Sequence, residues 1–179
     1  RISERLGETP WFLRLLRDSS DAAERLTHVL SGSRYVGELM EWTPESVAWL
    51  DQPEQLRPRS GVALQEEARA IQARHETTVN AMRAVRAIRR RELLRTAMSA
   101  LLGTISIEEL ADALTTITEV TIQATLRAVR AELLVGDAAT LDFSVIGMGR
   151  FGGAELGFGS DADVMFVYNA NETGSERAQ

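Results

Sequence analysis

The residues whose types and spacing could do chemistry lie near the end of the chain, between two short apolar runs. A glycine-rich segment, 149–153, follows the first run, and the aspartates Asp161 and Asp163 precede the second. The two runs, 143–148 and 164–168, have the length and composition of buried strands. This is the one stretch of the sequence whose pattern points to a reaction.

The pattern favours a metal and a nucleotide. Side chains alternate along a strand, so Asp161 and Asp163 are expected on one face. Two carboxylates on one face repel each other unless a cation lies between them, and Mg²⁺ prefers one or two carboxylates with water and phosphate oxygens. Gly152 and Gly153 let the backbone approach a ligand. A helix starting near Ala154 would turn its first N–H groups toward phosphate.

Arg150 would add a positive charge that is never lost, and the combination predicts phosphoryl or nucleotidyl transfer. Each part alone has a simpler explanation. An Asp-x-Asp pair is often a solvated strand end, a Gly-Gly pair is usually a turn, and Glu155 is expected in the first turn of a helix. The prediction therefore depends on the spacing of all the parts together.

The segment MGRFGGAELGFGSDADVMFVY, residues 148–168, resembles the nucleotidyltransferase motif of the glutamine synthetase adenylyltransferases, also called glutamate-ammonia-ligase adenylyltransferases. Members of that family carry two related units in one long chain. One unit attaches AMP to a tyrosine of glutamine synthetase, and the other removes it by phosphorolysis. The removing unit typically has an Asn after Glu-Leu and a second Ser before the aspartates, so ELGFGS at 155–160 is similar to the attaching unit.

The resemblance implies that Asp161 and Asp163 are catalytic and hold Mg²⁺, and that Gly152, Gly153 and Ser160 surround the triphosphate of ATP. Arg150 stands where members often have Lys and keeps the charge. The implied function is transfer of AMP from ATP to glutamine synthetase, which regulates nitrogen assimilation. The resemblance also suggests regulation by glutamine and by a nitrogen-signalling protein. Two alternatives stay open: the AMP-removing unit of the same family, and a non-catalytic helical interaction module.

Composition excludes several classes of protein. The chain has 179 residues, a net charge of −6 and a pI near 5.1, which argues against a nucleic-acid partner. It has no cysteine, so it has neither disulfides nor thiolate metal sites. No apolar run approaches the roughly 20 residues that span a membrane, and no signal-peptide pattern is present. We expect a cytoplasmic protein without a membrane partner.

Helical periodicity dominates the rest of the chain. The expected elements of an antiparallel helical bundle at 1–136 are short helices in 1–50, a loop at 52–61 and long helices at 62–102 and 106–135. Ser106 and Glu109 have the spacing of a capping box, and residues 33–50 loosely resemble the helical opening before each catalytic unit of the family. His75 falls on the apolar stripe of the first long helix, where a core histidine is expected. The predicted fold class is mainly α with a small β part (α+β).

Residues 137–179 are expected to form the first strands of a nucleotidyltransferase-type domain, with a disordered tail at 169–179. The chain does not begin with Met, and its opening is already helical in character, so we expect a piece of a longer protein. Enzymes of this kind usually place a third carboxylate on a later strand. No such strand follows residue 168, and we therefore expect little or no activity from this chain alone.

Overall fold

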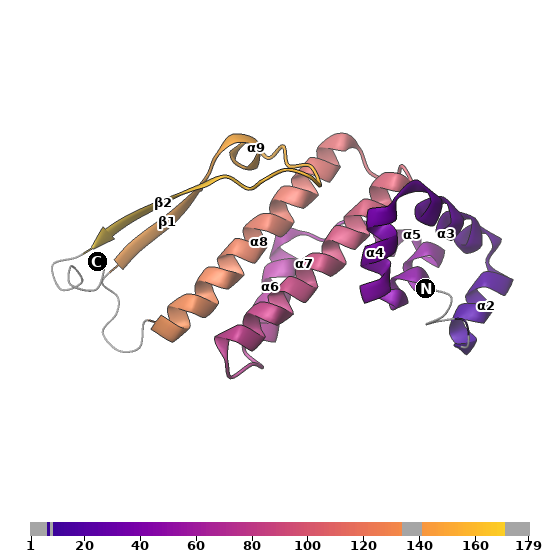
Figure 1. Ribbon diagram of the computed structural model, residues 1–179, viewed down its shortest axis with the longest axis horizontal. Coiled ribbons are helices and arrows are strands. Elements are labelled where there is room, and N and C mark those ends of the chain that lie inside the picture. The colour runs from indigo at the N-terminus through magenta and orange to yellow at the C-terminus, as the bar shows by residue number, and fades with distance from the viewer. Residues whose placement is uncertain (1–6, 8, 134–140, 171–179) are drawn as a thin grey trace. The chain divides into compact units, whose positions relative to one another are not determined.

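The computed structural model describes residues 7, 9–133 and 141–170 (Figure 1). The chain falls into two compact units. Unit 1 comprises Arg1–Ser60 and Ala87–Ala113, and unit 2 comprises Gly61–Arg86 and Leu114–Gln179. The described residues are mainly helical with a single two-stranded antiparallel sheet, which confirms the predicted fold class. None of the described helices is both long enough and apolar enough to cross a membrane. The boundary predicted at residue 136 lies outside the described residues.

Unit 1 is a cluster of short helices packed on the second part of a long one. Its short elements are α2 (Pro10–Asp18), α3 (Ser20–Gly32), α4 (Arg34–Trp42), the 3-10 helix η1 (Pro44–Asp51) and α5 (Pro53–Leu56). The long helix is α7 (Thr78–Leu101). The side chains of Met40, Leu50 and Met98 are fully buried in the core that these helices share. The short helices expected in residues 1–50 are therefore present from Pro10 onward.

The loop predicted at 52–61 is only partly correct, because α5 interrupts it and α6 (Gly61–Gln72) begins at its end. Pro53 occupies the first position of α5, where its fixed φ suits a helix and its missing N–H is not needed. Leu56, which closes α5, is 1% exposed and belongs to the core of unit 1. The buried side chain of Leu56 thus anchors α5, a short helix in a segment whose composition predicted a loop.

The single long helix predicted at 62–102 is wrong, since α6 ends at Gln72 and α7 starts at Thr78. The Thr77 hydroxyl accepts a hydrogen bond from the N–H of Asn80 at 3.3 Å, which is the contact of a helix N-cap. His75 lies in the break and is exposed, so it is not the core histidine that the apolar spacing suggested. A local cap outweighs the continuing 3.6-residue pattern here.

The second long helix, α8 (Ile107–Leu133), starts as predicted. The Ser106 N–H donates to Oε2 of Glu109 at 2.7 Å, and the Glu109 N–H donates to Oγ of Ser106 at 3.2 Å, which confirms the capping box. In unit 2, α6 packs on α8, where the Gln72 side chain donates to the carbonyl of Ala124 at 2.6 Å. The last two residues predicted for this helix, 134 and 135, lie outside the described residues.

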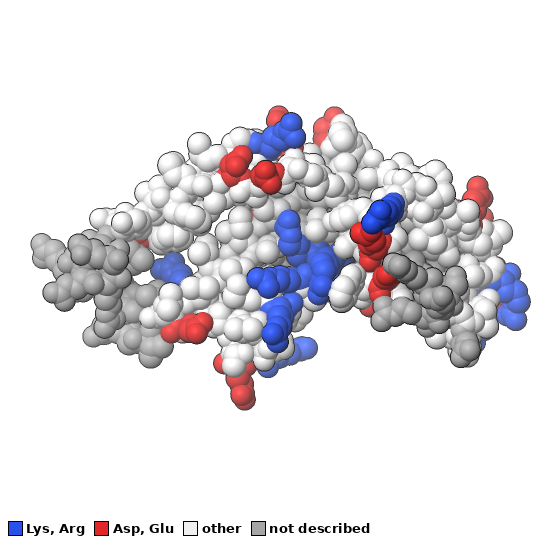
Figure 2. Space-filling view, viewed as in Figure 1, with Lys and Arg blue, Asp and Glu red and all other residues white. Residues whose placement is uncertain are grey.

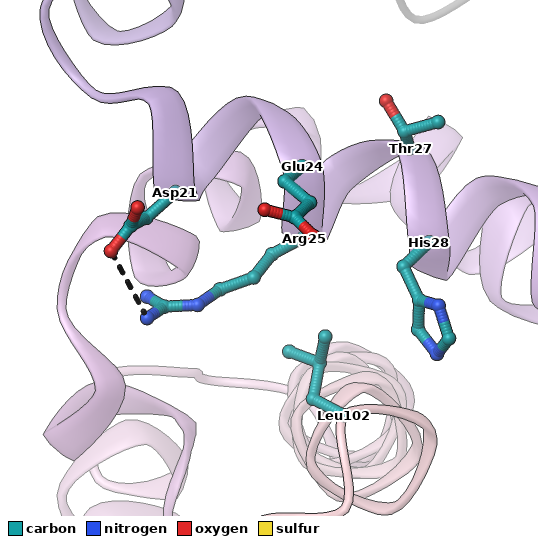
Figure 3. A pocket seen from close by; sticks show the side chains of 6 residues that line it. All are labelled: Asp21, Glu24, Arg25, Thr27, His28 and Leu102. Carbon is teal, nitrogen blue, oxygen red and sulfur yellow. Dashed lines mark ion pairs between the residues drawn. The ribbon is translucent and has the colours of Figure 1, made fainter.

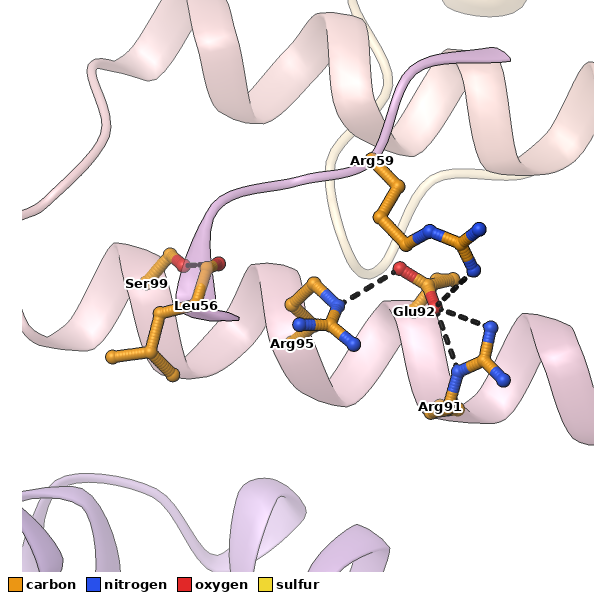
Figure 4. Close-up of polar contacts among 6 residues, drawn as sticks. All are labelled: Leu56, Arg59, Arg91, Glu92, Arg95 and Ser99. Atoms are coloured by element: carbon orange, nitrogen blue, oxygen red, sulfur yellow. Dashed lines mark hydrogen bonds and ion pairs between the residues drawn. The ribbon is translucent and has the colours of Figure 1, made fainter. Parts of the chain in front are cut away.

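A buried carboxylate organises the polar interior of unit 1. Glu92 is 1% exposed, and its carboxylate oxygens lie 2.7 Å from Nη2 of Arg91, 3.0 Å from Nε of Arg95 and 3.9 Å from Nη1 of Arg59 (Figure 4). The guanidinium carbon of Arg95 also lies 4.2 Å from the ring centroid of Trp49. Burial lowers the pKa of Arg95, and the negative charge of Glu92 opposes that shift.

Glu92→Gln should destabilise the chain by about 3–5 kcal/mol, because it leaves the buried guanidinium group of Arg95 without its carboxylate partner. The free energy of unfolding in urea measures the effect. Glu38→Gln is the matched control, since Glu38 makes an exposed ion pair with Arg34 at 2.8 Å and should contribute less than about 1 kcal/mol. Equal losses in the two variants would contradict the assignment of Glu92 as an organising charge.

Candidate functional site

The predicted strands form one antiparallel hairpin that brings the glycine-rich segment to the aspartates. Strand β1 (Leu141–Gly147) pairs with β2 (Val164–Ala170), and Gly147 lies opposite Val164. The single helical turn α9 (Gly149–Gly152) follows β1 directly and lies where β1 ends and β2 begins (Figure 1). Residue 169, expected to open a disordered tail, belongs instead to β2, and residues 171–179 lie outside the described residues.

Asp163 lies against the glycine turn. Its carbonyl accepts a hydrogen bond from the N–H of Met148 at 2.9 Å, which extends the hairpin by one bond beyond the strands. A side chain at Gly149 would begin 3.5 Å from Oδ2 of Asp163, so the carboxylate lies directly beside the turn. Gly149 has a φ of +50°, a conformation that favours glycine.

The two aspartates are exposed and precede β2, which begins at Val164. The prediction that Asp161 and Asp163 share one face because they lie on a strand was therefore wrong, since neither residue belongs to β2. What the structure provides instead is the backbone hydrogen bond of Asp163, which fixes the end of the aspartate segment against the turn.

The helix predicted from Ala154 is also absent. The helical turn comes earlier, as α9, and Ala154 has a left-handed φ of 56°. Glu155 follows the turn, and its N–H donates to the carbonyl of Arg150 at 2.7 Å, so Glu155 is not a first-turn helix residue. Because α9 has four residues, its dipole is too small to account for phosphate binding.

Arg150 and Ser160 approach each other across the turn. The Ser160 hydroxyl oxygen accepts from the N–H of Gly157 at 2.9 Å and, over a longer 3.5 Å, from Nη1 of Arg150. Ser160 is half-buried, whereas Arg150 is exposed. Figure 2 shows basic and acidic side chains next to each other on the surface over α9. The turn thus presents both signs of charge within one small area.

A hollow of about 380 Å³ lies between this turn and α8. Its lining residues are Glu119, Ile122, Gln123, Leu126, Val145, Gly147, Phe151 and Gly152. Among the predicted site residues only Gly152 lines it; Gly153 is exposed on the turn. Sequence reasoning missed the contribution of α8, although Glu119 shares a helical face with Ile122 and Gln123, which is a detectable mixture of polar and apolar positions.

The donor set fits a hard cation only in part. The described residues contain no cluster of three or more His, Cys, Asp or Glu side chains that could hold a metal. Two exposed carboxylates, Asp161 and Asp163, are nevertheless the donor type and number that Mg²⁺ uses when phosphate and water complete its shell. The residues present are therefore compatible with a magnesium ion that arrives together with a nucleotide.

Comparisons with known proteins all point to one family. The family described as glutamate-ammonia ligase adenylyltransferase matches residues 23–179. A bifunctional glutamine synthetase adenylyltransferase/adenylyl-removing enzyme from Leifsonia xyli is 57% identical over 178 residues, covering 99% of this chain and 18% of the relative. Enzymes with the same name from Streptomyces coelicolor and Mycobacterium leprae are 43% and 44% identical, covering 99% and 93% of this chain but 19% and 17% of their own length. The chain thus spans less than a fifth of these relatives.

Gly152→Ala should distort the turn, because its Cβ would lie 2.5 Å from the carbonyl oxygen of Gly147. We expect a loss of about 1–3 kcal/mol in the free energy of unfolding, with shifted backbone amide signals at the end of β1. Gly159→Ala is the control, since its Cβ would meet nothing within 4 Å, and it should be nearly neutral. A neutral Gly152→Ala would show that the turn has another conformation.

Proposed function

Since the chain belongs to the glutamate-ammonia ligase adenylyltransferase family, we propose that it forms the start of the unit that transfers AMP from ATP to a tyrosine of glutamine synthetase. This reaction would regulate nitrogen assimilation in the cytoplasm, with a nitrogen-signalling protein as a further partner. The observation that carries the proposal is the position of Asp163, whose carbonyl binds Met148 and whose carboxylate lies beside Gly149.

In this proposal Asp161 and Asp163 hold Mg²⁺. Mg²⁺ bound there would supply positive charge next to the triphosphate. The tyrosine oxygen would attack the α-phosphorus, the bond to pyrophosphate would break, and the tyrosine proton would pass to solvent. Arg150 supplies a permanent positive charge at the same turn. The Ser160 oxygen accepts from Gly157 and Arg150, and no described residue accepts its proton, so this hydroxyl can donate to a phosphate oxygen. The contribution of the chain is thus mainly placement and electrostatics.

The removal of AMP is the second candidate, because the relatives carry both activities in their name. The segment ELGFGS at 155–160 favours attachment, since the removing unit typically has an Asn after Glu-Leu. Both reactions would use the same metal and phosphate contacts, and only assays in both directions can separate them.

Asp161→Asn combined with Asp163→Asn, in the complete protein that contains this chain, should reduce AMP transfer by about 100-fold or more without unfolding the protein. Asp142→Asn is the matched control: Asp142 is exposed on the same hairpin but pairs with Asn169, about 16 Å along the strand from Gly147. Transfer and removal of AMP are both measured. If the double variant lost only the removal of AMP, this unit would be the AMP-removing one. If the rates of transfer and removal were both unchanged, the chain would be a non-catalytic helical interaction module.

The 179-residue chain assayed alone should show no AMP transfer above background. In the described part, both faces of β2 are exposed: Phe166 and Tyr168 on one face are about 60% accessible, and Met165 and Val167 on the other are 47% and 45% accessible. A two-stranded sheet is also marginal in water. The proposal also assigns a third carboxylate to a later part of the catalytic unit. Substantial turnover by the chain alone, with its dependence on Mg²⁺ intact, would contradict this division.

A further inference from the structure

A second hollow in unit 2, of about 630 Å³, lies where the break between α6 and α7 meets α8. Its charged and hydrogen-bonding lining includes Arg69, Gln72, His75, Glu76, Thr78, Arg127 and Glu132. Its volume is within the usual range of small-molecule sites. It shares no lining residue with the hollow beside α9.

Arg127 is the unusual residue of this hollow. Its Nε and Nη2 atoms are buried and have no hydrogen-bond partner within the described structure. These two nitrogens form one edge of the guanidinium group, the edge that binds two oxygens of a carboxylate or phosphate side by side. Buried polar atoms are normally hydrogen-bonded, and an unpaired edge of a charged group is a marked exception.

The described residues around Arg127 do not supply it with an anionic partner. Burial and the nearby positive charge of Arg69 both lower the pKa of Arg127. Gln72 and Thr78, which also line the hollow, already donate to the carbonyls of Ala124 and Ala128 on α8. Glu76 and Glu132 belong to the lining too, but neither forms an ion pair with Arg127 in the part of the chain that the structure describes.

A hollow in unit 1 provides a contrast. It has a volume of about 750 Å³, and its arginine, Arg25, is already satisfied (Figure 3). Arg25 donates through Nη1 to the carbonyl of Leu50 at 2.7 Å and pairs with Asp21 at 3.9 Å. A cavity with an arginine is therefore not enough; the unpaired bidentate edge is what distinguishes Arg127.

We propose that the hollow between the α6–α7 break and α8 binds one oxyanion, a phosphate or carboxylate group, toward which the Arg127 side chain turns its unpaired Nε–Nη2 edge, with Arg69 as a second positive charge. The site is independent of the proposed nucleotide site, because none of the predicted residues at 149–163 lines it.

Calorimetric titration of the complete protein that carries this chain tests the proposal, with inorganic phosphate and acetate as separate probes at constant ionic strength. Arg127→Gln should remove one saturable site from the stoichiometry. Arg127→Lys keeps the charge but not the fork and should weaken that site by about tenfold or more, and Arg69→Gln should weaken it less. Arg74→Gln is the charge-matched control, because Arg74 is exposed in the same break but does not line the hollow.

A site that takes phosphate more tightly than acetate identifies a phosphate-bearing ligand, and the reverse order identifies a carboxylate. If neither probe gives a site that Arg127→Gln removes and Arg74→Gln keeps, the proposal is overturned. Folding is checked in anion-free buffer, where Arg127→Gln should not lower the melting temperature, because no internal bond is lost. A lower melting temperature there would reveal an internal partner for Arg127 and would overturn the proposal as well.

Discussion

The register of the β1–β2 pairing is the constraint on which the candidate site depends. Because Gly147 lies opposite Val164, the chain that leaves β1 and the chain that enters β2 meet, and the bond from Met148 to Asp163 joins them. A slip of one residue would reverse the faces of β2 and carry Asp163 away from the turn. The stacked rings of Phe143 and Phe166, 5.7 Å apart across the strands, oppose such a slip. These apolar contacts therefore position the carboxylate, although they take no part in chemistry.

Helix α8 connects the two parts of unit 2 for which function is proposed. Leu126 lines the hollow beside α9, and its neighbour Arg127 lines the hollow at the α6–α7 break. Two threonines of this helix bond within it: the hydroxyl of Thr118 donates to the carbonyl of Leu114 at 2.9 Å, and that of Thr121 donates to the carbonyl of Ile117 at 2.7 Å. Such bonds within one helix satisfy buried hydroxyl groups without a partner from elsewhere. One helix thus presents adjacent residues to two separate cavities.

The sequence predicted those features that local chemistry determines. Ser106 and Glu109 satisfy each other across one helical turn, so their spacing was sufficient to place the start of α8. The break after Gln72 was missed because apolar residues continue on both sides of it, and only the bond of Thr77 to Asn80 reveals the new start. The glycine-rich turn at 149–153 was predicted, but its helical conformation, α9, was missed for another reason. Its conformation depends on two contacts: Gly152 packs closely against the Gly147 carbonyl, and the Met148 N–H donates to the Asp163 carbonyl. These contacts exist only once the two strands have paired.

The glycines of the turn divide into those that the fold requires and those that it does not. Gly149 has a positive φ, and a side chain at Gly152 would collide with the carbonyl of Gly147. Backbone conformation therefore accounts for the first glycine, and packing accounts for the second. Gly153 is different, because a Cβ there would lie 3.5 Å from the Gly149 oxygen, an ordinary contact. Within the described structure, then, no neighbouring atom excludes a side chain at Gly153. A ligand that approached the backbone closely at this position would exclude one. The fold therefore explains Gly152, although the sequence suggested that it contacts phosphate. The prediction of a phosphate contact at this turn now rests on Gly153 and on the carboxylate of Asp163.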